Sequence, residues 1–322
     1  DAVFTASVSE SVNLVSDQLQ VNTSSVVLWA DPDAVFQEQQ EFEILYGDTL
    51  MAKHYVTDLK IQGRRVTITG NDGISKLDKS KMPAMAAAET KTVQEWIEMI
   101  LSGAEKAERP VSLNPGSDAS ILSMKVSGIF DKEMSRREAL TTLCLAVGAY
   151  VDTSRAEGIV IRSTADALHA APVDPAPEDT EILSKVIPEQ HVFSGDSEEM
   201  REPYRTLAIK YKEGDEEKTT TPVINTAYSG SAAELVLDTC AMGVTEAGDS
   251  TAYGHFNTLQ DLYTEYYFHS GFYSSKAVMD ENIQMGDRIL VNGKDAFLIQ
   301  RTINLDGDKL IADGTYKLVE GR

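Results

Sequence analysis

The stretch SRREALTTLCLAVGAYVDTSRAEGIVI, Ser135–Ile161, changes within a few residues from a helical to a strand-like pattern. Ser135 and Glu138 form a capping box, in which the serine hydroxyl and the glutamate carboxylate each accept a backbone amide. An apolar stripe at helical spacing follows, made of Ala139, Leu140, Leu143, Cys144 and Val147. Gly148 then stops the helix. The sequence therefore predicts a helix over 136–147, followed by a hairpin of the segments AYVDT and GIVIRS.

Towards the N-terminus, the same succession of cap and stripe occurs at Thr92–Glu95, which reads TVQE. The apolar residues behind this second capping box are Val93, Trp96, Ile97, Ile100 and Leu101. Gly103 supplies a stop, so a helix over 93–102 is expected. The apolar stripe of each helix is too small for the helix to be stable alone. We therefore expect the two helices to pack together as one peripheral unit.

Residues 1–80 alternate between apolar and polar side chains with period two, which is typical of half-buried strands. The apolar members of this alternation are Val8, Val12, Leu14, Val26, Leu28, Phe42, Ile44, Tyr46, Val66 and Ile68. Gln62–Gly63 separates the runs DLKI and RRVTITG and indicates a hairpin turn. This part of the chain is predicted to consist of strands.

The second half of the chain mixes both patterns. The run HAAPVDPAPEDTE holds three prolines, which favours an extended linker over 166–189. A strand is expected at TLAIKYKE, a helix from Ser231 through about Cys240, and a second helix that ends at Gly271 and carries Leu259, Leu262, Tyr263, Tyr266 and Tyr267. The segments FYSSKAVM, DRILVN, AFLIQRTINL and KLIADGTYKLV return to strands. Segregated strands and helices indicate a β-rich α+β fold with more than one core.

The charge of the chain restricts its partners. Its 322 residues include 29 Lys and Arg against 51 Asp and Glu, a net charge of -22. Such a surface repels nucleic acid and anionic lipid, so neither specific DNA binding nor membrane binding is expected. No apolar run reaches the length of a transmembrane helix, and the first residues do not form an intact secretory signal. Cys144 and Cys240 stand in apolar contexts, where buried free thiols are expected, as in a protein that assembles in a reducing cytoplasm.

The sequence offers no catalytic constellation. The five histidines, His54, His169, His191, His255 and His269, lack the spacing of metal ligands. Tyr228–Ser231, which reads YSGS, is the segment nearest to a nucleophile elbow but lacks the GxSxG frame. Asn71–Gly73 and Asp306–Asp308 resemble fragments of calcium loops but lack the remaining ligands, and they indicate β-turns. We therefore predict no enzyme activity and no catalytic, cofactor-binding or metal-binding residues.

Three stretches resemble hub proteins of phage tails, also called baseplate hub or tail-tip proteins, in the version found in prophages of Gram-positive bacteria. They are Val56–Lys79, Ser135–Ile161 and Ile187–Gly195. The first is similar to the closing hairpin of a tail-tube-type barrel, and the second is the most specific. With the C-terminal strands that begin at GDRILV, the resemblance spans most of the chain.

The resemblance implies a virion structural protein that is assembled in the host cytoplasm as a homotrimer. Each subunit of such a hub contributes two small tube-like β-barrels, so that three subunits present a pseudo-sixfold ring to the hexameric tail tube. The barrels would comprise residues 1–85 and residues 190–228 plus 272–322. Residues 86–165 would form a peripheral helix–hairpin domain, and residues 229–271 a helical insertion. The hub joins the tail tube to the spike, tip or baseplate proteins. The tape-measure protein and DNA pass through its channel without specific binding.

A second interpretation is a carbohydrate- or receptor-binding module of a tail tip or cell surface, which would also be β-rich. Its aromatic side chains would then line a sugar site; they are Tyr253, Phe256, Tyr266, Tyr267, Phe272 and Tyr273. At helical spacing, the tyrosines of the last predicted helix are more typical of core packing. A hydrolase is the weakest interpretation, because no nucleophile with a neighbouring base can be named.

Overall fold

A computed structural model describes residues 2–31, 33–102, 111–130, 132–155, 158–173, 185–193, 195–213, 216–228, 233–239, 241–246, 252–269, 271–305 and 310–319. Several predicted features fall wholly or partly outside these ranges. They include Gly103, Cys240, most of the linker (174–184), Asp306–Asp308, residues 229–231 of the Tyr228–Ser231 segment, and the start of the helix predicted from Ser231. Within the described residues, no helix is long and apolar enough to cross a membrane.

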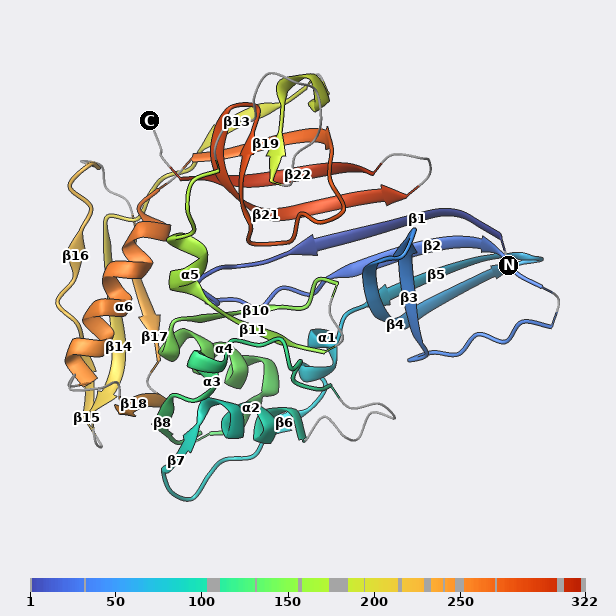
Figure 1. Ribbon diagram of the computed structural model, residues 1–322. Coiled ribbons are helices and arrows are strands. Elements are labelled where there is room, and N and C mark those ends of the chain that lie inside the picture. Colours follow the sequence, from blue (N-terminus) through green and yellow to red (C-terminus); the bar gives the residue numbers. More distant parts are fainter. Residues whose placement is uncertain are drawn as a thin grey trace.

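An eleven-stranded sheet dominates the fold (Figure 1). Its N-terminal half consists of β1 (Ala2–Ser11), β2 (Thr23–Trp29), β3 (Glu41–Tyr46), β4 (Thr49–Gln62) and β5 (Arg65–Asn71). Its C-terminal half consists of β12 (Val186–Ile187), β13 (Ser197–Met200), β19 (Gly271–Val278), β20 (Arg288–Val291), β21 (Lys294–Leu305) and β22 (Ile311–Leu318). The main path runs β13-β19-β22-β21-β1-β2-β5-β4-β3, which leaves β13 and β3 at its two ends.

The two halves meet where β1 pairs with β21. The antiparallel ladder runs from Ala6 opposite Leu305 to Ser11 opposite Gln300. The prediction of two separate barrels is therefore wrong in one respect, because a single continuous sheet joins residues near both ends of the chain. The hairpin predicted at Gln62–Gly63 is confirmed. Gly63 adopts φ +63°, a left-handed conformation that glycine tolerates, and β4 and β5 pair on either side of it.

Both capped helices are confirmed, as α2 (Val93–Ser102) and α4 (Arg136–Val147). They pack against each other, and the Arg136 guanidinium donates a hydrogen bond of 2.6 Å to the Ile100 carbonyl at the end of α2. The hairpin after Gly148 is also confirmed, as β10 (Ala149–Asp152) and β11 (Val160–Ser163).

The surrounding elements of this helix–hairpin unit are short. They are α1 (Ile74–Leu77), β6 (Lys81–Met82), β7 (Glu89–Thr92), α3 (Ala119–Leu122), β8 (Lys125–Gly128), β9 (Met134–Ser135), α5 (Thr164–Leu168) and β18 (Met242–Glu246). The centre of the unit is apolar: Trp96 packs edge-to-face on Phe130 at 5.7 Å, and its ring N–H donates to the Val126 carbonyl at 2.9 Å. Helix α5 occupies Thr164–Leu168, where the predicted linker begins.

A third unit contains α6 (Ala252–Tyr267) and a four-stranded sheet of β14 (Thr206–Glu213), β15 (Glu216–Thr219), β16 (Val223–Ile224) and β17 (Glu234–Asp238). It corrects two predictions. TLAIKYKE is a strand, β14, but belongs to this separate sheet instead of pairing with the C-terminal strands. The predicted helix from Ser231 is strand β17 where described, because Glu234–Asp238 pairs in parallel with β14. Helix α6 is confirmed and lies on this sheet (Figure 1).

Candidate functional site

The structure does not bring the histidines together. His54 lies buried in the large sheet, where its Nδ1 is 2.8 Å from the Ser24 hydroxyl. His255 Nε2 donates to the Ala146 carbonyl at 2.9 Å, whereas His269 follows the opposite end of α6. Within the described residues, no group of three His, Cys, Asp or Glu side chains could hold a metal ion. His255 and His269 therefore lie at opposite ends of α6 and do not approach each other as a metal-binding pair would.

The segment Asn71–Gly73, interpreted from the sequence as a turn, contains a buried carboxylate. Asp72 accepts hydrogen bonds from the Asn22 amide at 3.0 Å, the Ile74 amide at 3.1 Å and the Thr153 hydroxyl at 2.5 Å. Burial raises the pKa of Asp72 to about 6, although the three donors act in the opposite direction. Since Asn22 precedes β2 and Thr153 follows β10, this side chain joins the large sheet to the helix–hairpin unit.

The tyrosines of α6 pack into the core, as their helical spacing indicates. The Tyr263 hydroxyl donates to the Leu145 carbonyl at 2.6 Å, which attaches α6 to α4. Phe256 stacks on Tyr211 of β14 at 4.7 Å. Tyr266 is 8% exposed and Phe256 is fully buried, so neither ring offers a face to a sugar in solvent.

The other aromatics of the carbohydrate interpretation are similarly placed where they are described. Tyr273 is buried, and Tyr267 and Phe272 are partly buried. Tyr267 contacts Tyr204 and Tyr266 edge-to-face at 5.7 and 5.2 Å. The side chain of Tyr253 lies outside the described residues. The five rings whose side chains are described do not form the exposed aromatic platform that the carbohydrate interpretation requires.

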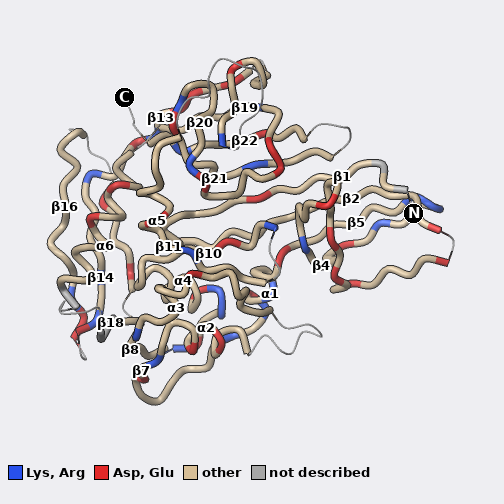
Figure 2. The backbone as a smooth tube through the Cα atoms, in the orientation of Figure 1, with Lys and Arg blue, Asp and Glu red and all other residues tan. Residues whose placement is uncertain are grey.

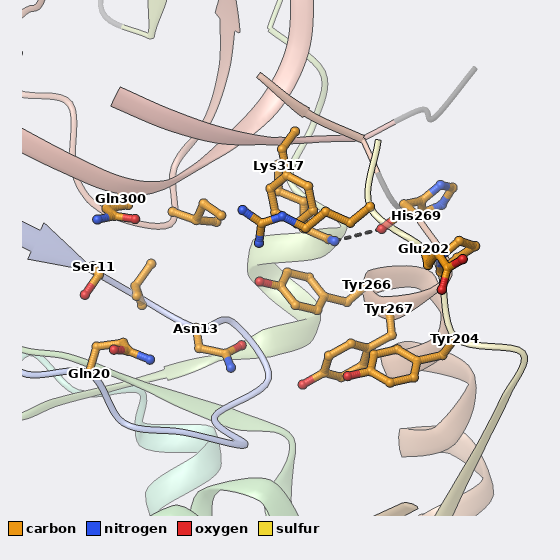
Figure 3. A pocket seen from close by; sticks show the side chains of 15 residues that line it. Ser11, Asn13, Gln20, Glu202, Tyr204, Tyr266, Tyr267, His269, Gln300 and Lys317 are labelled. Carbon is orange, nitrogen blue, oxygen red and sulfur yellow. Dashed lines mark hydrogen bonds between the residues drawn. The ribbon is translucent and has the colours of Figure 1, made fainter. Parts of the chain in front are cut away.

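A cavity of about 470 Å³ lies where the large sheet meets the end of α6. Figure 3 shows polar side chains of the β1 end and of β21 on one side, and tyrosines on the other. The lining side chains are Ser11, Val12, Asn13, Gln20, Arg201, Glu202, Pro203, Tyr204, Tyr266, Tyr267, His269, Phe272, Ile299, Gln300 and Lys317. Several segments that are distant in sequence therefore converge on it, and no local motif could have revealed it.

Two cations stand out in this cavity of an acidic protein. Lys317 on β22 is 5% exposed, and its ammonium lies 4.5 Å from the Tyr266 ring centroid and 4.7 Å from that of Phe272. The Arg201 guanidinium carbon lies 4.1 Å from the centroid of the same Phe272 ring. Burial, and then the charge of Arg201, lower the pKa of Lys317 to about 8. Acidic and basic residues are both distributed widely along the backbone (Figure 2).

A buried ion pair holds the junction between the two halves of the sheet. Arg301 and Glu10 stand opposite each other on β21 and β1, and the Arg301 Nε donates to the Glu10 carboxylate at 2.5 Å. Their side chains are 0% and 1% exposed. Arg301 also donates to the Ile283 carbonyl at 2.6 Å. No local pattern in the sequence predicts this pair, because both residues lie within ordinary alternating strands.

The far end of the N-terminal half of the sheet exposes apolar side chains. Val3 is 61% exposed and Ile61 is 62% exposed. Trp29 is 42% exposed, and the Arg64 guanidinium carbon lies 5.6 Å from its ring centroid. On the outermost strand, β3, Leu45 is 55% exposed. Exposed apolar side chains near the rim of a sheet are typical of surfaces that contact other proteins.

Comparisons with known proteins identify the fold. No family model matches the chain, and no curated protein matches it. The tail protein from Neisseria meningitidis MC58 matches over 98% of this chain and 92% of its own, with a TM-score of 0.62 and 12% identity. The prophage tail protein gp18 from Listeria monocytogenes EGD-e matches over 98% and 89%, with a TM-score of 0.59 and 10% identity.

A third solved structure extends the comparison. The c3393 protein of E. coli matches over 98% of this chain and 73% of its own, with a TM-score of 0.53 and 11% identity. It is described as a component of the type VI secretion system with structural similarity to the T4 tail proteins gp27 and gp5. The chain therefore has a fold found among tail proteins. Proteins from Neisseria and Listeria match at nearly the same identity, so the comparison does not single out a Gram-positive type.

Proposed function

We propose that the chain is a structural, non-enzymatic subunit of a phage or phage-like tail, and that it forms the trimeric hub ring between the tail tube and the tip, spike or baseplate. The observation that carries this proposal is the shared fold over 98% of the chain with tail proteins from two organisms. The similarity to a secretion-system component that resembles T4 tail proteins supports a place in a tube-and-spike machine. The resemblance of three sequence stretches to tail hubs supports the same role.

The arrangement of the large sheet supports a ring. Its path ends at β3 on one side and at β13 on the other. Within the described residues of a single chain, no further strand pairs with the outer edge of either strand. Unpaired strand edges are a liability that proteins protect or pair. In the proposed ring, β3 of one copy lies beside β13 of the next, and the N-terminal and C-terminal halves supply the two tube-like positions of each subunit.

The proposed ring encloses a channel for the tape-measure protein and DNA. A net charge of -22 on each copy suits a passage that does not bind the DNA backbone, because a basic wall would hold it through counterion release. We place the mature protein in the virion tail, after assembly in the host cytoplasm.

Native mass spectrometry and electron microscopy of the purified chain, alone and with its tail-tube protein, test the proposal. We expect three copies in a ring, measured near 0.15 M salt, where a Debye length of about 8 Å screens the acidic surfaces. A monomer that persists with the tube protein present overturns the hub role. A ring with another copy number overturns the trimer.

A pair of variants tests the contact between strand edges. Leu45→Lys places a charge on the exposed rim of β3 and should reduce ring formation without unfolding the chain. Ile224→Lys is the matched control, because Ile224 is 62% exposed on β16 in the separate four-stranded sheet. Equal ring formation by both variants would contradict the proposed place of β3.

A further inference from the structure

The cavity between the large sheet and α6 has a polar and charged lining, which a simple gap in packing would not need. It combines a buried ammonium, a guanidinium, three tyrosines and several amide or hydroxyl side chains (Figure 3). Buried cations are costly unless an opposite charge or full hydrogen bonding compensates them. The groups that surround Lys317, and the charge that they leave uncompensated, therefore indicate which kind of ligand the cavity binds.

Lys317 has donor capacity that the described residues do not use. Its ammonium carries three N–H donors, and one of them meets the His269 carbonyl oxygen at 2.8 Å. Within the described part of the chain, no carboxylate forms an ion pair with it. Glu202 lines the same cavity but pairs with neither Lys317 nor Arg201 there. The charge of Lys317 is thus met by one carbonyl and by the faces of Tyr266 and Phe272.

Arg201 adds a second positive charge beside the first. Both cations approach the Phe272 ring, and the only ion pair of Arg201 within the described residues is an exposed one with Glu199 at 3.5 Å. Lys317 is buried, whereas the Arg201 side chain is 56% exposed at the mouth of the cavity. The two neighbouring cations repel each other, and an anion placed between them would replace this repulsion with two attractions. A guanidinium can also bind a carboxylate through two parallel hydrogen bonds.

We propose that this cavity binds a carboxylate group carried by a polypeptide, with Lys317 and Arg201 as its ligands. The amide and hydroxyl side chains of Ser11, Asn13, Gln20 and Gln300 would meet the peptide groups next to that carboxylate. A volume of about 470 Å³ leaves room for a short peptide terminus or an acidic side chain. The inference does not depend on the proposed place of the chain in a tail.

The observations favour a peptide over a sugar or a polyanion. Lys317 lies near the Tyr266 and Phe272 rings, and Tyr267 is engaged edge-to-face by its neighbours, so these rings are already occupied by protein groups. The net charge of -22 repels a nucleic acid or another polyanion at long range, but a single carboxylate far less. A neighbouring subunit or partner could supply such a group.

Isothermal titration calorimetry with N-acetyl-triglycine, its C-terminal amide and inorganic phosphate tests the proposal on the full chain. We expect the acid to bind with a Kd near 1 mM, at least tenfold more tightly than the amide. At pH 8, binding should take up protons, because an added anion favours the charged form of Lys317. At pH 6 this uptake should disappear, since Lys317 is already protonated. Lys317→Arg, whose guanidinium stays charged at both pH values, should bind the acid without proton uptake at pH 8.

Variants identify the residues responsible. Lys317→Met should weaken binding of the acid at least tenfold and abolish proton uptake at pH 8, whereas Lys317→Arg should retain binding. Lys276→Met is the control, because Lys276 is exposed on β19 of the same sheet. Equal affinity for acid and amide, or unchanged binding by Lys317→Met, overturns the proposal. Absence of binding by the acid, or binding of phosphate in its place, also overturns it.

Discussion

In the helix–hairpin unit, each boundary is determined by residues a few positions away, whereas the large sheet is joined by residues from opposite ends of the chain. Helix α4 begins at the Ser135–Glu138 capping box and ends at Gly148, which adopts φ +70°. The sheet is joined by Glu10 and Arg301, which are 291 positions apart. The first unit therefore depends on local signals and apolar packing. The sheet junction depends on a long-range polar contact in a buried site.

The difference has a consequence for stability. Loss of apolar volume in the helix–hairpin unit leaves a cavity, whose cost depends on how far the surroundings relax. Loss of one charge at the sheet junction leaves its partner buried and unpaired, and this costs more free energy of unfolding than a cavity does. We therefore expect the most damaging single substitution in the junction, although most of its neighbours are ordinary strand residues.

Arg301→Met should cost about 3–5 kcal/mol in the free energy of unfolding, because Glu10 then remains buried without its partner. Urea denaturation of the purified chain measures the change. The double variant Glu10→Met/Arg301→Met should recover most of the loss, since it removes both charges. Lys81→Met is the exposed control: Lys81 and Glu133 are about two-thirds exposed, and this pair should contribute less than about 1 kcal/mol. A single-variant cost as small as that of the control would contradict this account of the junction.

Leu140→Ala tests the apolar side of the comparison. Leu140 is fully buried within α4, and its truncation should cost about 2–5 kcal/mol through lost burial and a residual cavity. Unlike the junction variant, it has no partner whose removal could restore stability. Denaturation curves with unchanged slope would show that only stability has changed. A loss below about 0.5 kcal/mol, the usual range for surface positions, would place the side chain outside the core.

A third prediction uses the pH dependence of the N-terminal half of the sheet. Burial lowers the pKa of His54 from 6.5 to about 4, so the folded chain holds this ring neutral. Between pH 6.5 and 4 the unfolded chain binds a proton that the folded chain does not, and stability falls as the pH falls. The full loss is about 3 kcal/mol, at 1.36 kcal/mol for each pKa unit.

His54→Asn should remove this dependence while its amide replaces the ring Nδ1 beside Ser24. Asp72, whose pKa is raised to about 6, titrates in the same range with the opposite sign. The measurement is therefore the difference between wild type and variant at pH 7 and pH 4, in which the contribution of Asp72 cancels. Parallel curves for the two proteins would contradict the prediction.

The same contrast determines what the sequence can predict. Helices 93–102 and 136–147 match the structure because capping boxes are local signals, and the hairpin at Gly63 matches for the same reason. The sequence predicts a helix where strand β17 lies, because Ser231 resembles a helix cap and the short run ELVLD is compatible with either a helix or a strand. Its parallel pairing with β14 decides the outcome. The cavity around Lys317 had no sequence signal, since its lining comes from segments separated by most of the chain.

The smallest predicted effect concerns the caps. The Ser135 hydroxyl accepts the Glu138 amide at 3.1 Å, and the Thr92 hydroxyl accepts the Glu95 amide at 3.2 Å. Ser135→Ala and Thr92→Ala should each cost about 1 kcal/mol, because one helix amide loses its acceptor.

Thr142→Ala is the control for both cap variants. Thr142 lies on the exposed side of α4 and its hydroxyl donates only to the Glu138 carbonyl one turn earlier, a bond that contributes little. Its truncation should change stability by less than about 0.5 kcal/mol. If the two caps act independently, the double variant Ser135→Ala/Thr92→Ala should lose the sum of the single losses. A double loss clearly larger than that sum would show that the helices are coupled through their starts as well as their apolar faces. The stability of the helix–hairpin unit would then depend, like that of the sheet, on coupling between residues that are far apart in the sequence.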